Sequence, residues 1–422
     1  MLLTQNPKGT KDVLPQESGR WQAVEARMRE AAARAGFREV RTPVFEHTEL
    51  FARGIGDTTD VVQKEMYTFE DKGGRSITLK PEGTAGAVRA FAQAGLFNEP
   101  LPAKMYYLNA PIFRYENPQS GRLREHHQFG LECFGAQEAT ADAELIILAY
   151  RLIEGLGIHN LSVNINSIGC PNCRPAYHDK LKDFLRNKYD TLCPTCKTRF
   201  EKNPLRVIDC KEPGCKALVQ DAPSMLDMLC DDCAAHFALL QKLLTAAGIP
   251  FKVDSHIVRG LDYYTKTVFE LITTTPQGEL TVCGGGRYDH LVEQIGGKPT
   301  PAVGFGMGIE RLLLLLEQEK IDLNVPPVLQ LFVAAMGEEA RVPAFLLTQR
   351  LRTVGIRADM DHTGRSAKAQ FKYANNLGVE YVAILGGDEL ERGVVKLRSM
   401  ATREEKDIPL ENIEEEITKL FA

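Results

Sequence analysis

The sequence predicts an α+β core that is interrupted by a helical, cysteine-rich insertion and followed by a small α/β domain at the C-terminus. Strand-like segments at 104–115 and 122–134 flank a polar loop, as in a long antiparallel hairpin. Eight of the ten cysteines fall between Cys170 and Cys233. After a proline pair at 326–327, strand and helix patterns alternate, which favours a largely parallel sheet.

Length and composition bound the function classes. The chain has 422 residues, of which 44% are hydrophobic and 25% charged, so it is no disordered chain, collagen-like fibre or disulfide-stapled miniprotein. The longest aliphatic run, 312–316, is far shorter than the ~20 residues that span a bilayer. The polar N-terminus carries no apolar signal core, so we expect a cytoplasmic protein without a membrane partner. The net charge of −5 does not by itself indicate a polynucleotide partner.

The core is expected in two parts, at 1–169 and 250–322, on either side of an insertion at 170–249. Its first helix is predicted at 15–36, because Trp21, Val24 and Met28 recur at helical spacing. A strand broken by Pro43 follows at 40–45, and alternating apolar residues predict another at 161–168. The remaining predicted elements are a helix at 140–155, strands at 251–257, 266–274 and 279–283, and a strand, glycine turn and buried helix within 301–318.

A linker at 321–328 leads to the C-terminal domain, which is expected at 329–422. The pattern predicts strands at 329–335, 356–361, 380–385 and 393–399 and helices at 338–354, 366–377 and 409–421.

Glycine-rich segments give no recognisable phosphate loop. The chain lacks GxxxxGK[ST], and GxGxG at 304–308 lacks the next glycine of a dinucleotide fingerprint. The run at 284–286 is more typical of a tight turn than of a phosphate site.

Charged residues in apolar surroundings are the stronger signal. An arginine in a strand is costly unless it is paired or bound to an anion. Four arginines of this chain could together bind a polyphosphate, or each could form a structural ion pair: Arg114, Arg122, Arg259 and Arg311. Glu82 precedes a predicted helix, which it could cap. Gln128 and Glu132 share one strand face, which suits a ligand with an amine or a solvated sheet face.

Several motifs together resemble the histidyl-tRNA synthetase family of bacterial type: KGTKD at 8–12, LKPEGT at 79–84, FRYE at 113–116, RGLDYY at 259–264, GGGRYD at 284–289 and GFGMGIER at 304–311. The similarity covers almost the whole chain in order. It implies a class II aminoacyl-tRNA synthetase, with an antiparallel sheet flanked by helices, a C-terminal anticodon-binding domain and a homodimer. The implied reaction joins L-histidine to its tRNA through histidyl-adenylate and uses ATP with Mg²⁺.

The resemblance also implies roles for single residues. Arg114 and Arg259 would act at the α-phosphate, Arg122 and Arg311 at the γ-phosphate, and Glu116 at the adenine. The histidine amino group would be bound by Glu82, Thr84 and Gln128. The imidazole would be recognised by Glu132 and Tyr264, with Tyr263 and Tyr288 closing the pocket. Contacts with tRNA are expected from Arg365, Lys368 and Lys372, although a solvated helix face explains them equally well.

The clustered cysteines form pairs with metal-ligand spacing: Cys170/Cys173, Cys193/Cys196, Cys210/Cys215 and Cys230/Cys233. Eight thiolates allow up to two Cys₄ zinc sites. Reduced packing cysteines or partial disulfides are the alternatives. Cys133 and Cys283 stand alone and are expected to be buried apolar fillers.

One relative of a different class shares the implied fold. A histidine-sensing regulatory subunit of ATP phosphoribosyltransferase resembles these synthetases but does not charge tRNA. It lacks the C-terminal domain and the RGLDYY segment, both of which this chain keeps. A generic nucleotide- or RNA-binding module leaves Glu82, Gln128 and Glu132 unexplained. The sequence therefore favours the ligase.

Overall fold

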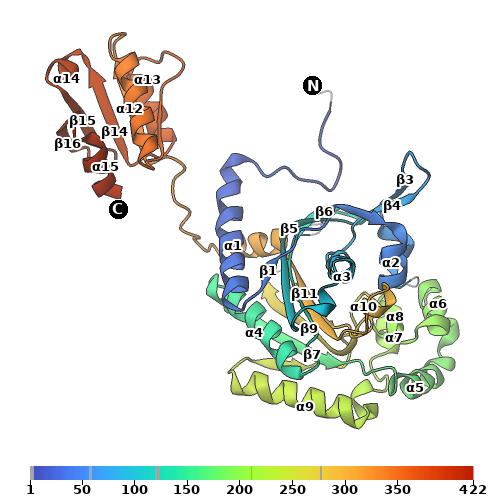
Figure 1. Ribbon diagram of the computed structural model, residues 1–422. Coiled ribbons are helices and arrows are strands. Elements are labelled where there is room, and N and C mark those ends of the chain that lie inside the picture. Colours follow the sequence, from blue (N-terminus) through green and yellow to red (C-terminus); the bar gives the residue numbers. More distant parts are fainter. Residues whose placement is uncertain are drawn as a thin grey trace. The chain divides into compact units, whose positions relative to one another are not determined.

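The computed structural model describes residues 4–56, 59–118, 121, 123–210, 212–275 and 278–421 (Figure 1). The chain divides into two compact units between Leu323 and Asn324. Among the described residues, no helix combines the length and the apolar character that crossing a membrane requires.

The first unit is built on an eight-stranded sheet in the order β1-β5-β6-β11-β10-β9-β7-β8. Its inner strands pair antiparallel, and the edge strands β1 and β8 pair parallel. The expected hairpin is confirmed as β5 and β6. The strands are β1 (Arg38–Glu39), β5 (Ala103–Phe113), β6 (Glu125–Phe134), β7 (Leu161–Ser167), β8 (Phe251–Val253), β9 (Thr265–Thr275), β10 (Gly278–Arg287) and β11 (Ala302–Gly308).

One face of this sheet is covered by four helices, which share a hydrophobic core with it. Phe129 and Leu131 of β6 and Phe305 of β11 point into that core. Because strand side chains alternate, their neighbours Gln128 and Glu132 point to the opposite face. The covering helices are α1 (Pro15–Arg34), α4 (Ala139–Gly155), α9 (Asp231–Ala246) and α11 (Ile309–Gln318).

The opposite face carries smaller elements. Phe91 of α3 stacks on Phe134 of β6 with 4.4 Å between ring centroids, so α3 lies directly against this face. The elements here are α2 (Thr48–Ile55), η1 (Val61–Glu65), α3 (Thr84–Gln93), η2 (Leu96–Asn98), α10 (Leu291–Gln294) and a separate sheet of β2 (Phe45–His47), β4 (Ser76–Leu79) and β3 (Thr68–Glu70).

The single strand expected at 40–45 is wrong. The chain instead forms β1 at 38–39 and β2 at 45–47, which belong to different sheets. Pro43 lies between them and has no N–H to donate to a ladder, so the strand cannot continue through it.

The segment between β7 and α9 is helical, as the cysteine-rich region was expected to be. Its buried residues belong to the same hydrophobic cluster as Tyr264 and Tyr288, so this insertion packs onto the core. It contains α5 (Arg174–Arg186), η3 (Tyr189–Thr191), α6 (Pro194–Lys202), α7 (Leu205–Ile208), α8 (Pro213–Leu218) and η4 (Met225–Met228).

The second unit is a five-stranded α/β fold in the order β13-β12-β14-β15-β16. Its strands are β12 (Leu331–Met336), β13 (Ala358–Met360), β14 (Tyr381–Gly386), β15 (Val394–Ser399) and β16 (Glu405–Pro409). Its helices are α12 (Arg341–Thr353), α13 (Ala367–Asn376), α14 (Gly387–Glu391) and α15 (Ile413–Phe421).

Three features of this unit differ from the expectations. The sheet is mixed rather than largely parallel, because β15 and β16 pair antiparallel. β16 was not predicted, and the last helix starts at Ile413 rather than at 409. Only Ile408 of β16 is buried, so this edge strand shows no apolar alternation in the sequence.

Candidate active site

Glycines of β10 and β11 form the floor of the candidate site on the sheet face opposite α4. A Cβ at Gly284 would lie 2.6 Å from the guanidinium carbon of Arg259, and one at Gly286 would lie 2.9 Å from Cδ1 of Tyr264. A Cβ at Gly304 would collide with the Glu132 carboxylate. The run at 284–286 is therefore part of a strand, and the expected tight turn is wrong. Glycine is needed here because neighbouring side chains lie across the backbone.

Glu132 lies at the centre of a buried cluster of hydroxyl groups. Its carboxylate accepts hydrogen bonds from the Tyr288 hydroxyl and, at 3.3 Å, from the Tyr107 hydroxyl. The ring of Tyr263 lies 4.6 Å from that of Tyr264 and 5.6 Å from that of Tyr288. The structure thus brings four of the residues predicted to contact histidine into one cluster.

Tyr107 is a member of this cluster that the sequence analysis missed. It pairs with Gly130 across the hairpin, and Cβ atoms placed at Gly130 or Gly83 would collide with its ring. The available signal was an aromatic residue on one hairpin arm opposite a glycine on the other.

Burial raises the pKa of Glu132 to about 8, although its hydrogen bonds with Tyr288, Thr84 and Tyr107 act in the opposite direction. Its pKa in an unfolded chain is close to 4.5. Folding therefore favours the protonated form. The stability that this group contributes is present below pH ~4.5 and is lost as the pH rises toward about 8.

Glu132→Gln is therefore expected to stabilise the ligand-free protein increasingly as the pH rises, because the amide does not ionise. The difference in melting temperature between variant and wild type should widen by several degrees between pH 5 and pH 8.5. Thermal unfolding at a series of pH values measures this. A constant difference would show that Glu132 keeps an ordinary pKa.

Glu82 caps helix α3 at its N-terminus. Its two carboxylate oxygens accept the backbone N–H groups of Thr84 at 2.7 Å and of Ala85 at 2.6 Å, which confirms the capping interpretation. Burial raises the pKa of Glu82, and these two bonds oppose the shift. Gln128 lies on the same face as Glu132, with its Nε2 3.5 Å from the Cβ position of Gly306.

Arg259 has a left-handed backbone with φ of +68°, which is uncommon for a residue other than glycine. Its guanidinium forms a close ion pair with Glu270 of β9, and Glu270 also accepts the Thr281 hydroxyl at 3.2 Å. Burial lowers the pKa of Arg259, but Glu270 outweighs this and the net shift is upward. The guanidinium therefore remains charged beside the glycine floor.

Arg114 and Arg311 each donate to a backbone carbonyl. Nε of Arg114 donates to the carbonyl of Pro81 at 2.7 Å, and Nη1 of Arg311 donates to that of Thr281 at 2.8 Å. His126 of β6 is affected by both arginines: burial, then Arg114, then Arg311 lower its pKa to about 3. A neutral His126 thus lies within a positive region.

Glu116 and Arg122 are the other two residues predicted to contact ATP. The backbone carbonyl of Glu116, three residues after β5, accepts Nε of Arg124 at 3.1 Å. Arg122 lies outside the described residues.

The eight clustered cysteines form two groups of four sulfur atoms, each group lying within 4.8 Å. Cluster A is Cys170, Cys173, Cys230 and Cys233, and cluster B is Cys193, Cys196, Cys210 and Cys215. Cluster A therefore joins the first and last cysteine pairs in the sequence, and cluster B joins the two pairs between them.

The sulfur spacing within the clusters fits a tetrahedral metal. Sγ of Cys170 lies 3.7 Å from those of Cys173 and Cys230, and Cys193 and Cys210 are 3.9 Å apart. A zinc ion with bonds of about 2.3 Å to four sulfurs would separate them by about 3.8 Å. All ten cysteines are free thiols, which contradicts the partial-disulfide alternative, and Cys133 and Cys283 are buried as expected.

In the second unit, Lys368 and Lys372 are exposed one turn apart on α13. Arg365 precedes the helix and is held by Asp361 at 2.5 Å and by the ring of Tyr373, whose centroid is 4.1 Å away. Arg365 is therefore already paired within this unit, whereas the two lysines are exposed.

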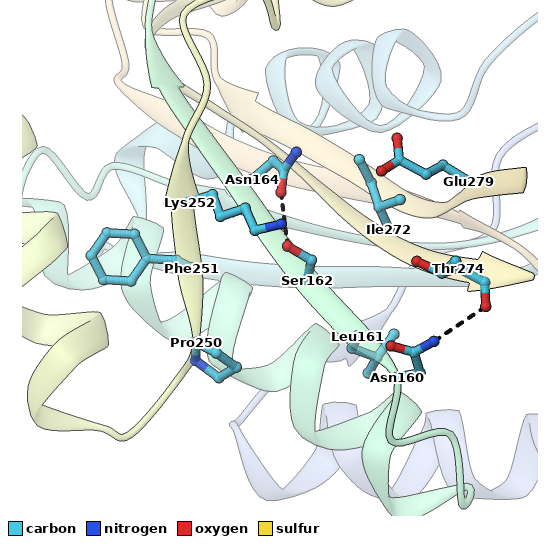
Figure 2. A pocket seen from close by; sticks show the side chains of 10 residues that line it. All are labelled: Asn160, Leu161, Ser162, Asn164, Pro250, Phe251, Lys252, Ile272, Thr274 and Glu279. Carbon is cyan, nitrogen blue, oxygen red and sulfur yellow. Dashed lines mark hydrogen bonds between the residues drawn. The ribbon is translucent and has the colours of Figure 1, made fainter.

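A separate pocket of about 320 Å³ lies at the edge formed by β7, β8 and β9 (Figure 2). It is lined by Asn164 and Lys252 among others, and Asn164 pairs with Glu270 in the ladder. None of the residues predicted to contact substrate lines it.

Comparisons with known proteins match both units. The histidyl-tRNA synthetase family model matches residues 9–172 and 215–312, and the anticodon binding domain model matches 330–420. A histidine–tRNA ligase of Clostridium novyi is 56% identical over 98% of both chains. The apo histidyl-tRNA synthetase of S. aureus is 36% identical, with a TM-score of 0.85 over 98% of this chain and 99% of its own.

A more distant structure shares the fold alone. It is described as an ATP phosphoribosyltransferase regulatory subunit/histidyl-tRNA synthetase from Bacillus halodurans, and it is 22% identical with a TM-score of 0.66 over 92% of this chain and 99% of its own. The much higher identity of the full-length ligases decides between the two groups. The chain belongs to the histidyl-tRNA synthetase family.

Proposed function

We propose that this chain attaches L-histidine to its tRNA in two steps. The full-length similarity to histidine–tRNA ligases carries this proposal, together with the anticodon-binding domain at 330–420. The first unit is a class II synthetase core, whose glycine-floored sheet face would hold the substrates.

In the first step a carboxylate oxygen of histidine attacks the α-phosphorus of ATP. The bond from that phosphorus to the bridging oxygen breaks, and pyrophosphate leaves with its Mg²⁺. Arg114 would contact the α-phosphate and Arg259 would lie beside both the phosphate and the carboxylate. Positioning and fixed positive charge are the main contributions that a protein makes to such a step. Arg311 and Arg122 would hold the γ-phosphate, with Glu116 on the adenine side.

The buried hydroxyl cluster suits the histidine side chain. Glu132 would accept an imidazole N–H and Tyr264 would bond the other nitrogen, while Tyr263 and Tyr288 close the pocket. Glu82 would bind the α-amino group with Thr84 and Gln128. Each carboxylate oxygen of Glu82 already accepts one backbone N–H and has a further lone pair for an ammonium group.

In the second step a hydroxyl of the terminal adenosine of tRNA attacks the histidyl carbonyl, and AMP leaves. The second unit would bind the anticodon region, with Lys368, Lys372 and Arg365 as candidate contacts. Translation occurs in the cytoplasm, where we place the protein. The family resemblance supports a homodimer.

Zinc is the metal that fits the two cysteine clusters best, because four thiolates at tetrahedral spacing are typical of structural zinc. Elemental analysis of protein purified under reducing conditions is expected to give two zinc ions per chain. Well under one zinc per chain would contradict this assignment.

The regulatory-subunit alternative is disfavoured by the anticodon binding domain at 330–420. Transfer of radiolabelled histidine to purified histidine tRNA separates the two proposals. We expect ATP-dependent charging by the full chain. If the protein binds histidine but charges no tRNA, it acts as a sensor and the proposed function is wrong.

A further inference from the structure

Arg259 needs support from its surroundings. Its left-handed backbone is a conformation that persists only where neighbouring structure holds it. The ion pair with Glu270 fixes the side chain but does not fix the backbone of the loop. A second set of contacts reaches that backbone from the cysteine-rich insertion.

The main contact is made by Arg206 of α7. Its Nη1 donates a close hydrogen bond to the backbone carbonyl of Arg259, and the residue is only 3% exposed. Two residues of the same segment add to it. Nδ2 of Asn203 donates to Oδ1 of Asp262 at 3.1 Å, and Nη1 of Arg199 donates to the Arg206 carbonyl at 3.3 Å. The segment formed by α6 and α7 thus binds the 259–262 loop at both ends.

Cysteines of cluster B lie at both ends of this segment in the sequence. Cys193 is the N-cap of α6, and Cys196 lies in its first turn. Cys210 follows α7 by two residues. α7 has four residues, which is far too short for a helix to be stable alone. A metal bound by cluster B would tie the two ends of the segment together and keep Arg206 in place.

We propose that a metal ion in cluster B holds Arg206 against the Arg259 carbonyl, which makes Arg206 a positioning residue for histidine adenylation. The proposal rests on the proposed function. Arg206 touches no substrate in this scheme. It acts by keeping the Arg259 guanidinium where charge develops on the α-phosphate.

Cluster A provides a contrast within the same chain. Its member Cys173 directly precedes Arg174, the first residue of α5. Nη2 of Arg174 donates to the carbonyl of Tyr264 at 2.8 Å. Cluster A therefore supports the histidine end of the 259–264 segment, and cluster B supports the phosphate end. Loss of cluster B should chiefly reduce the rate of adenylation, whereas loss of cluster A should chiefly weaken histidine binding.

The direct test compares Arg206→Gln with Arg186→Gln, a matched control on α5 whose side chain is 70% exposed. Steady-state ATP–pyrophosphate exchange gives kcat and the KM for histidine, and elemental analysis gives the metal content. We expect Arg206→Gln to keep the wild-type metal content, to lose about tenfold or more in kcat and to change KM by less than about twofold. Misplacement of a reacting group by about 1 Å costs on the order of 10² in rate. Arg206→Lys should recover part of the loss, because lysine can still donate to the carbonyl.

The metal link is tested with Cys193→Ser/Cys210→Ser, alone and combined with Arg206→Gln. We expect the cysteine variant to lose one metal ion and to match Arg206→Gln in kcat, with no further loss in the combination. A kcat for Arg206→Gln equal to that of Arg186→Gln would overturn the positioning role even if the cysteine variant does not fold. Additive losses would overturn the link to the metal. Absence of exchange in the wild type would instead refute the proposed function.

Discussion

Arg259→Ala is expected to lower histidine-dependent ATP–pyrophosphate exchange by on the order of 10²–10³, because one preorganised charge at a developing anion contributes this much. The guanidinium lies over Gly284 and remains charged beside Glu270. The loss should appear in kcat, since the charge acts most strongly when negative charge grows on the phosphate. Exchange close to wild type would contradict the role assigned to Arg259.

The control for Arg259→Ala must account for the ion pair between Arg259 and Glu270. Removing Arg259 leaves the partly buried Glu270 without its main partner, which destabilises the fold separately from catalysis. Arg259→Ala combined with Glu270→Gln should recover much of the lost melting temperature and none of the activity. Recovery of both would show that Arg259 is needed for folding rather than for adenylation.

Glu132→Gln is expected to lower kcat/KM for histidine by roughly 10- to 100-fold, because disturbing a hydrogen bond to a buried polar group costs about 1–3 kcal/mol. The same variant should be more stable than wild type above neutral pH, since burial raises the pKa of Glu132 to about 8. Loss of activity in a more stable protein separates recognition from folding. Unchanged kcat/KM would remove Glu132 from the imidazole site.

The hairpin and the faces of its strands could be predicted, because alternation along 122–134 assigns Phe129 and Leu131 to the core and Gln128 and Glu132 to the other face. The role of the glycines at 284–286 could not. Gly284 and Gly286 lie against Arg259 and Tyr264 of the loop before β9, and Gly285 lies against the backbone of β11. Composition does not show such approaches. Tyr107 was missed for the same reason.

The sequence also did not show which cysteine pairs share a cluster. Short spacing, CxxC in three pairs and CxxxxC in the fourth, identifies which two thiols are close, but four pairs can form two groups of four in three ways. The path of α5 to α8 selects the nested arrangement. Edge strand β16 was missed because its single buried residue, Ile408, gives no period.

Histidine activation is tested most directly by ATP–pyrophosphate exchange with the purified full chain, with each of the twenty amino acids in turn and without tRNA. We expect exchange with histidine alone, because a site built to hydrogen-bond polar atoms rejects analogues that lack them by ~10⁴–10⁵. No exchange with any amino acid, from folded protein that still binds histidine, would contradict it and indicate a histidine-sensing regulatory subunit.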